Sequence, residues 1–425
     1  MNILKEVLSH EVMPSMGCTE PVAVALAAAH ASRAVGGKVW RVVAELDPGT
    51  FKNGMNVFIP GTNGAVGIPI AMALGAICGD PKNGLNLLKN IDSKCLKEAE
   101  KLVAQHEISI KPNFSKDYLY IKVKVKTDKG EGIAKIVRGH TNLVELKKNG
   151  LRIKGTGAKT GCEVENYREF LRKLSIKDLI KAAENADKKE LAYMKEGVEM
   201  NLKASKEGMK YKGFAHQISQ MVKSGVLKDD FFSKTKVIVS AASDGRMAGM
   251  SLPVMSSGSS GNQGVVAVLV PYLFGKENGV ANEKIMKSIA LSHLLNAYVK
   301  AFAGELSPIC QCAIAAGVGA AAACVYQRKN DMKLIGHAIN NVANDLGGMF
   351  CNGANLGCAI KVASSAEAAI TSALVALNGF CISDSNGIIG ATPEETLQNL
   401  AKITCEGMGK TNEVILGIMK RQAEV

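Results

Sequence analysis

The spacing of hydrophobic residues changes near residue 170, which divides the chain into a mixed part and a helical part. Before this point, hydrophobic and polar residues alternate over Val39–Leu46 and again over Leu119–Lys126, which reads LYIKVKVK. Alternation of this kind is typical of strands with one buried face. Stretches at 132–137 and 142–146 continue the pattern, and 71–105 has helical spacing. We therefore predict a mixed α/β domain over 36–165.

Beyond Leu174 the apolar residues recur at helical spacing, and clusters of Gly and Asn separate the segments. We predict an all-helical domain over 170–425. Residues 1–35 are also helical in pattern, and we expect these N-terminal helices to pack on the helical domain. The predicted fold class is α+β, with a mostly helical domain and a smaller mixed α/β domain. The candidate helices cover 176–186, 189–224, 264–275, 282–303, 308–326, 331–346, 356–377 and 393–422.

The composition adds that these helices contain many small residues. The chain has 425 residues, of which 43 are glycine and only 5% are aromatic. Small side chains let helices approach each other closely and let the backbone approach a ligand. The longest apolar runs, such as Cys312–Tyr326, are rich in Ala and Gly and too short for a membrane span. We expect buried helices and no membrane partner.

The charge and the cysteine count indicate the compartment and the partners. The formal charge is +13, but the lysines are scattered and no basic run is interleaved with aromatic residues. We therefore expect no nucleic-acid partner, and a small anionic metabolite accounts for the charge as well. The eleven cysteines are an odd number without a secretory signal pattern, so we expect reduced thiols and a cytoplasmic location. The oligomeric state stays open, with a homodimer as one expectation.

Three cysteines near predicted helix starts are the main candidates for chemistry. Ser307-Pro308 is a strong helix start, and Cys310 then falls in the first turn. Cys358 occupies the same position after Asn355, and Cys351 lies in the loop before it. Amide hydrogens in a first turn lack helical partners and favour a thiolate. Cys312 would lie about 200° around the same helix from Cys310, so we favour Cys310 as the member of the set.

Three thiolates can hold three irons of a cubane cluster and leave the fourth iron open as a Lewis acid. The C-x6-C spacing of Cys351 and Cys358 is not a ferredoxin or zinc-ribbon signature. From the residues alone, buried free cysteines that act as small hydrophobic residues are the default interpretation. We assign the remaining cysteines apart from Cys18 to that class, namely Cys78, Cys95, Cys162, Cys324, Cys381 and Cys405.

Cys18, in the sequence MGCTEP, is a candidate base or nucleophile. We expect Thr19 to cap a helix whose first turn holds Glu20 and Pro21, which places the thiol at the positive end of the helix dipole. This position favours a thiolate, whereas the nearby Glu20 raises the thiol pKa. A structural cysteine is the alternative.

Two glycine-rich loops, Pro60–Pro69 and Ser256–Gly264, are suited to holding a carboxylate, and less clearly a phosphate, on free backbone amides. Neither loop is a Walker A motif, and a tight turn is the alternative for each. His140-Thr141-Asn142 closes a predicted strand and is either a substrate contact or a surface turn. Arg246 either pairs with Asp244 or orients a carboxylate. The substrate-binding residues we predict are Thr62, Asn63, His140, Asn142, Ser256, Ser257, Ser259 and Asn262.

Taken together, these motifs resemble the L-cysteine desulfidase family, which is related to the alpha chain of the iron–sulfur L-serine dehydratases. The resemblance runs nearly end to end and depends on the order of six segments. They are MGCTEP, GTNGAVGIP, SDGRMAGMSLPVMSSGSSGNQG, SPICQC, CNGANLGCAIKVASSAEAA and DSNGIIG. The C-x6-C spacing agrees with the desulfidases and is shorter than in the serine dehydratases, which favours cysteine as the amino-acid substrate.

The resemblance implies an oxygen-sensitive [4Fe–4S] lyase that needs no pyridoxal phosphate and converts L-cysteine to pyruvate, ammonia and sulfide. It implies that Cys310, Cys351 and Cys358 are the cluster ligands and that Cys18 accepts the α-proton. SPICQC holds two candidate ligands, and Cys310-Gln311 matches the family pattern better than Cys312. An L-serine dehydratase and a cluster-bearing sensor without turnover remain as alternatives.

Overall fold

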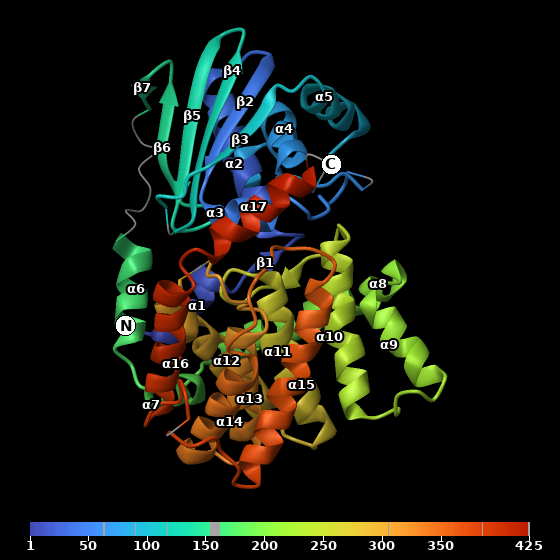
Figure 1. Cartoon of the computed structure of the whole chain (residues 1–425), viewed down its shortest axis with the longest axis vertical. Coiled ribbons are helices and arrows are strands. Elements are labelled where there is room, and N and C mark those ends of the chain that lie inside the picture. Colours follow the sequence, from blue (N-terminus) through green and yellow to red (C-terminus); the bar gives the residue numbers. More distant parts are fainter. Residues whose placement is uncertain are drawn as a thin grey trace.

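The computed structural model describes residues 1–62, 64–89, 91–116, 118–153, 162–304, 306–384 and 386–423. Figure 1 shows two parts stacked along the long axis, a sheet with its helices above a larger group of helices. Most of the described residues are helical, and the upper part contains one six-stranded sheet. The fold class is therefore α+β, and the prediction from the sequence is confirmed.

The six strands of the sheet follow the order β3-β2-β4-β5-β6-β7. The pair β2–β3 is parallel, and the other neighbouring pairs are antiparallel. The alternating pattern predicts β2, β4, β5 and β6 to within two residues. The short strands β3 and β7 offer too few alternations to be recognised. The bounds are β2 Val39–Leu46, β3 Ile108–Pro112, β4 Tyr120–Thr127, β5 Gly130–Val137, β6 Leu143–Lys148 and β7 Leu151–Arg152.

Helices cover one face of the sheet, and the other face carries lysines. Along β4, Val123 and Val125 are fully buried, whereas Lys124 between them is partly exposed. The buried face packs against α2, whose alanines let the helix lie close to the strands. The helices and turns of this part are α2 Thr19–Val35, α3 Pro48–Gly54, α4 Ile68–Cys78, η1 Pro81–Asn86 and α5 Ser93–Ala104.

The N-terminal segment 1–35, which we treated as one unit on the helical domain, divides between the two parts. Helix α1, Ile3–Glu11, packs into the core of the helical part, whereas α2 belongs to the core of the sheet. Strand β1, Pro14–Ser15, lies between them and pairs with β8, Val254–Met255, of the helical part. The expected domain boundary at 165–170 falls within α6, and residues 154–161 before that helix lie outside the described residues.

A disulfide joins two helices of the sheet part. Cys78 at the end of α4 and Cys95 in the first turn of α5 are bonded, with their Cα atoms 6.2 Å apart. We expected both residues to be free, reduced cysteines, and this expectation is wrong. Cysteine spacing along a sequence does not reveal which thiols a fold brings together.

The larger part packs its helices around α11, α12 and α13. Helix α13 is buried along nearly its whole length, and Gly319 lies so close to α12 that an added Cβ would be 2.5 Å from the Ser292 carbonyl oxygen. This contact confirms the expectation that small residues let the helices approach each other closely. The bounds are α6 Cys162–Arg172, α7 Ile176–Glu184, α8 Lys188–Gly208, η2 Met209–Tyr211, α9 Phe214–Lys223, α10 Phe231–Met247, α11 Gly261–Glu277, α12 Asn282–Ala303, α13 Ile314–Arg328, α14 Met332–Leu346, α15 Cys358–Leu377, α16 Pro393–Lys402, η3 Ile403–Gly407 and α17 Thr411–Ala423.

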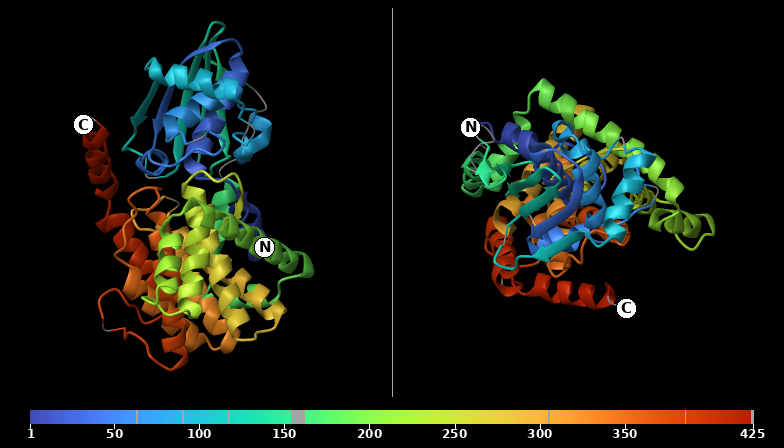
Figure 2. Two further views of the ribbon diagram at one scale, coloured as in Figure 1. Left: turned by 90° about the vertical axis from the view of Figure 1, so that its right-hand side faces the viewer. Right: turned by 90° about the horizontal axis from the view of Figure 1, so that it is seen from above.

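Helix α15 is the one helix in the described part of the chain that is long and apolar enough to cross a membrane. Of its most apolar window, 56% is buried inside the protein, as is usual for a core helix. Helix α17 leaves the helical part and contacts α3 of the sheet part (Figure 2). Together with the β1–β8 pair, it connects the two parts next to the first turn of α2.

Candidate active site

The segment around Cys310 does not begin a helix, which corrects the prediction of a helix over 308–326. Ile309 instead forms a β-bridge with Phe350. The Cys310 amide donates to the Met349 carbonyl (2.8 Å), and the Cys351 amide donates to the Pro308 carbonyl (2.6 Å). Helix α13 begins only at Ile314 because these long-range bonds outweigh the local helix-start signal. The pairing brings Cys310 beside Cys351.

Four cysteines of the helical part line one pocket with Cys18. Cys358 is the first residue of α15, where its sulfur accepts a hydrogen bond from the Asn355 amide at 3.5 Å. Cys310 and Cys312 both lie in the turn before α13, so the helical angle that separated them does not exist. Cys312 therefore faces the same pocket and stays a second candidate in this segment.

Among the thiols of this pocket, Cys18 and Cys310 are buried and the other three are partly buried, and their pKa values diverge. Burial raises the pKa of Cys358 to about 12 and also raises that of Cys351. A hydrogen bond from Cys312 instead lowers the pKa of Cys310 to about 6. Lys361 also lines the pocket, with its ammonium held by the Phe350 carbonyl oxygen at 2.6 Å. The pocket thus offers a thiol set with a cation beside it.

A buried cation, Lys52 of α3, holds the loop that carries Cys351. Its side chain is 1% exposed, and its Nζ donates to the Cys351 carbonyl (2.8 Å) and to Asn412 Oδ1 on α17 (2.7 Å). Burial lowers the pKa of this ammonium, while the nearby thiols Cys351 and Cys310 favour its charged form. Lys52 carries no sequence signal that would have identified it.

The same loop approaches α3 so closely that a glycine is required. Gly353 has a φ of +95°, and an added Cβ would lie 2.6 Å from the Lys52 carbonyl oxygen. A side chain at this position would both strain the backbone and push the loop away from α3. The glycine in CNGANLGC therefore fixes where Cys351 and Cys358 lie.

Cys18 enters the pocket from the sheet part of the protein. It is the N-cap residue of α2, and its thiol donates to Glu20 Oε2 at 2.8 Å. Asn53 of α3 donates from Nδ2 to Glu20 Oε1 at 3.0 Å. The Oδ1 atom of Asn53 accepts a weaker bond from the Cys351 thiol at 3.7 Å. Asn53 thus connects the Cys18–Glu20 pair to the cysteines of the helical part.

The Cys18–Glu20 pair holds its proton on sulfur. Burial and the adjacent Glu20 carboxylate raise the pKa of Cys18 well above its ordinary value. Burial by itself raises the pKa of Glu20, but His140 and the hydrogen bonds from Cys18 and Asn53 outweigh it, so this pKa is lowered. We expected the helix N-terminus to favour a Cys18 thiolate, and in this pair the carboxylate outweighs the dipole. Glu20 is thus the ionised partner.

Arg246 is the principal cation of the pocket, and it does not pair with Asp244. Asp244 accepts from the Ala215 amide instead. Arg246 Nη1 donates to Asn262 Oδ1 at 2.5 Å, and Nη2 donates to the Gly17 carbonyl oxygen. Its Nε is buried and has no hydrogen-bond partner among the described residues. An unpaired buried donor of this kind is costly unless a ligand accepts from it.

The second glycine-rich loop packs closely against the side chain of Arg246. An added Cβ on Gly261 would lie 2.3 Å from the Arg246 guanidinium carbon. Gly258 and Ser259 both have positive φ angles, so the loop is a tight turn as well. The glycines of Ser256–Gly264 therefore allow the tight turn, and they also leave room for the Arg246 guanidinium to lie against the loop.

The substrate-binding residues predicted from the sequence do not gather at one place. Asn262 lines the thiol pocket. Four others line an adjoining cavity of about 90 Å³, namely His140, Asn142, Ser256 and Ser259. Thr19 lines both cavities, so they meet beside Cys18. His140 Nε2 is buried without a hydrogen-bond partner among the described residues.

Two further predicted residues serve the fold and line neither cavity. The Thr62 hydroxyl donates to the Ile59 carbonyl oxygen at 2.6 Å and closes its own turn. The Ser257 hydroxyl lies behind the glycine loop, 2.8 Å from both His293 Nδ1 and Asn296 Nδ2. Asn63 lies outside the described residues.

The potential metal donors of the pocket are soft thiols. Among the described residues, no group of three His, Cys, Asp or Glu side chains is close enough to hold one metal ion. The thiols are instead spread around a pocket with two cations, Arg246 and Lys361. Soft thiolates select iron–sulfur clusters, zinc or copper over magnesium and calcium. The chemistry of the pocket therefore fits a group that spans several thiolates.

Comparison with known proteins agrees with this picture. A family model described as serine dehydratase alpha chain matches residues 82–417. The match includes Arg246 and the four cysteines of the helical part, and it leaves Cys18 and Asn53 outside. The fold and the match define a protein with a serine dehydratase alpha-chain domain, which indicates a lyase-type enzyme.

Full-length relatives show the family. A UPF0597 protein of Elusimicrobium minutum is 47% identical over 424 residues, and one of Geobacter sulfurreducens is 44% identical over 428 residues. Each alignment covers 100% of this chain and 100% of the relative. A UPF0597 protein of Clostridioides difficile is 36% identical over 426 residues, covering 99% of this chain and 100% of the relative. The chain belongs to the UPF0597 family.

Proposed function

We propose that this protein is a [4Fe–4S]-dependent lyase that converts L-cysteine to pyruvate, ammonia and sulfide without pyridoxal phosphate. The observation that carries the proposal is the convergence of Cys18, Cys310, Cys351 and Cys358 on one pocket beside Arg246. These residues come from segments up to 340 positions apart, since 358 − 18 = 340. The serine dehydratase alpha-chain domain supports a lyase of this kind.

We assign the cluster to Cys310, Cys351 and Cys358. When bound, a cluster held by three thiolates supplies an open iron that acts as a Lewis acid toward the substrate. The protein contributes the pocket and two cations, Arg246 and Lys361, that offset the negative charge of the thiolates. Lys52 holds the Cys351 loop in place through the backbone.

Arg246 binds the substrate carboxylate. Its unpaired Nε and its position in the pocket provide a charge-assisted donor for that group. Asn262 and the Gly17 carbonyl oxygen hold the two Nη atoms, which fixes the direction in which Nε points. A carboxylate bound here would place the substrate Cα near Cys18.

The Cys18–Glu20 pair accepts the α-proton. In the resting pair the proton stays on sulfur, while the neighbouring Arg246 favours the Cys18 thiolate. The reaction begins when this proton passes to Glu20, and the thiolate then removes the proton from Cα. The Cβ–S bond then breaks, and its electron pair leaves with the sulfur as hydrosulfide. The other product is aminoacrylate, which tautomerises and takes up one water to give pyruvate and ammonia.

Anaerobic purification followed by a substrate comparison tests the proposal. We expect a brown protein with iron and acid-labile sulfide, which releases equal amounts of pyruvate and sulfide from L-cysteine. A colourless protein after anaerobic reconstitution with iron and sulfide contradicts the cluster and with it the mechanism.

The same experiment separates the alternatives. The family model favours an L-serine dehydratase as a second candidate, and a higher kcat/KM for L-serine than for L-cysteine would establish it. An intact cluster without turnover of either amino acid would identify a sensor instead.

A further inference from the structure

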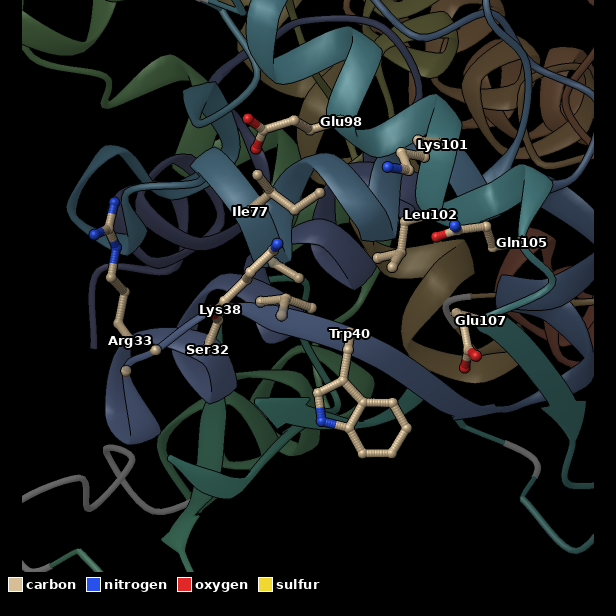
Figure 3. A pocket seen from close by; sticks show the side chains of 14 residues that line it. Ser32, Arg33, Lys38, Trp40, Ile77, Glu98, Lys101, Leu102, Gln105 and Glu107 are labelled. Carbon is tan, nitrogen blue, oxygen red and sulfur yellow. The ribbon is translucent and has the colours of Figure 1, made fainter. Parts of the chain in front are cut away.

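A large hollow lies in the sheet part, at the end of α2 opposite to Cys18. Its volume is about 980 Å³, which is in the size range of small-molecule sites. The C-terminal ends of α2, α4 and α5 and the first residues of β2 form its walls (Figure 3). The function proposed above does not use this hollow.

The hollow presents charges of both signs around an apolar centre. Figure 3 shows Glu98 and Lys101 of α5 and Gln105 just after it on one side, and Arg33 and Lys38 on the other. Glu107 adds a second carboxylate. None of these five charged groups forms an ion pair within the described part of the chain. The apolar surface between them comes from Ile77 and Leu102.

The helix ends determine which ligand charges this hollow accepts. Three helices point their C-terminal ends toward it, and a helix C-terminus carries partial negative charge. A phosphate is therefore disfavoured here, whereas an ammonium group is favoured by the helix ends and by the two carboxylates. The three basic side chains of the hollow can bind a carboxylate of the same ligand, next to its ammonium group.

We propose that the hollow is a binding site for a zwitterionic α-amino acid with an apolar or extended side chain. The ammonium group lies against the helix ends with Glu98 or Glu107, and the carboxylate lies against Arg33, Lys38 or Lys101. The side chain rests on Leu102 and Ile77. Such a ligand complements both charges and the apolar surface at once.

The site is separate from the thiol pocket, so its ligand is an effector rather than the substrate undergoing reaction. Helix α2 begins next to Cys18 and ends at this hollow, and its 17 residues span about 25 Å. The helix is buried along most of its length and forms a direct physical connection between the two sites.

The chain contains a natural reporter for this site. Trp40 is its single tryptophan, is 46% exposed and lies on β2 at the rim of the hollow, with its ring on the outer side of the strand and the Lys126 ammonium 5.6 Å from its ring centre (Figure 3). Tryptophan fluorescence of the full-length protein therefore reports binding without any assay of activity. We expect L-leucine, L-methionine or L-glutamine to change it in a saturable way. Succinate and 1,4-diaminobutane, which each carry charge of one sign, should leave it unchanged.

Charge reversal on α5 completes the test. Glu98→Lys and Lys101→Glu are expected to weaken binding at least about tenfold, which is 1.4 kcal/mol. Lys97→Glu and Glu100→Lys, on the same helix but outside the hollow, should bind as the wild type does.

Three results would overturn the proposal. One is the absence of a saturable signal with every amino acid up to about 10 mM, a concentration that detects millimolar sites. The others are equal responses to succinate or the diamine, and equal binding by the lining and control variants. The readout is independent of the cluster, so it succeeds or fails separately from the proposed lyase activity.

Discussion

Arg246 is buried among the thiols with one guanidinium nitrogen unpaired, and this residue allows a direct test of carboxylate binding. Arg246→Lys keeps a charge but loses the planar donor fork. Because hydrogen bonds to charged groups contribute about 1.5–3 kcal/mol, we expect kcat/KM for L-cysteine to fall about 10- to 100-fold. The control Arg328→Lys, at the exposed end of α13, should retain wild-type kinetics. An Arg246→Lys enzyme within twofold of the wild type would refute this role.

The two cysteines of SPICQC can be separated by their iron content. Cys310 is bonded through its backbone to the segment of Cys351, so we expect it to be the ligand. Cys310→Ser should lose most of the iron and the charge-transfer absorbance after anaerobic reconstitution. Cys312→Ser, two residues away, should retain both. The opposite pattern would assign the cluster to Cys312.

His293 makes the stability of the helical part sensitive to acid. Burial lowers its pKa to about 3, whereas an unfolded histidine titrates near 6.5. Between these values the unfolded chain binds the extra proton, so the free energy of unfolding falls by about 1.4 kcal/mol per pH unit as pH decreases. By pH 5 this loss is about 2 kcal/mol.

His293→Asn keeps a polar partner for Ser257 and removes this titration. Urea unfolding at pH 7 and pH 5 should show a pH difference about 2 kcal/mol smaller in the variant than in the wild type. The matched variant His216→Asn on the outer helix α9 should keep the wild-type difference. An unchanged difference in His293→Asn would disprove the assignment.

At the scale of elements, the loop before α15 decides whether the thiols meet. Gly353→Ala introduces a Cβ at 2.6 Å from the Lys52 carbonyl oxygen, at a φ of +95°. We expect a loss of about 1–3 kcal/mol in stability and a lower iron content, since the loop must move away from α3. Gly348→Ala, a nearby position where a Cβ meets nothing within 4 Å, is the control and should be neutral. Equal iron content in the two variants would contradict the importance of this contact.

Elements with a clear period could be predicted, and those without one could not. Helix α12 spans Asn282–Ala303 as predicted, because its Gly and Asn boundaries are unambiguous. Helix α10, Phe231–Met247, is missed because its second half is buried on all sides, polar residues included, so no apolar stripe alternates with a solvent face. The predicted helix 189–224 is broken between α8 and α9, where Lys212 adopts a left-handed conformation. Similarly, 393–422 contains the π-helix η3 between α16 and α17.

The cysteines of the site could be predicted from the sequence, but the residues that contact them could not. Cys18 and the cysteines of the helical part carry recognisable motifs, and the structure brings them to one pocket. Asn53 and Lys52 act through contacts across about 300 residues of chain, |i−j| being 298 and 299, and no local pattern marks them. The glycine-rich surroundings of Thr62 favour a ligand contact, but in the structure its hydroxyl closes a turn.

At the scale of the whole molecule, the candidate site lies where the sheet part and the helical part meet. The sheet part contributes Cys18, Glu20 and Asn53, and the helical part contributes Arg246 and the other thiols. The β1–β8 pair and the contact of Lys52 with Asn412 hold the two parts together at this place. Neither part by itself contains the complete set of groups, so the arrangement of the parts determines whether the pocket exists.

The most direct measurement of the central claim is the release of sulfide and pyruvate from L-cysteine by the anaerobically reconstituted protein, beside its Cys18→Ser variant. We predict equal amounts of the two products from the wild type. The variant should give no turnover while its iron content and cluster absorbance stay unchanged. A fully loaded wild type that releases neither product, or a Cys18→Ser variant that is equally active, would contradict the account.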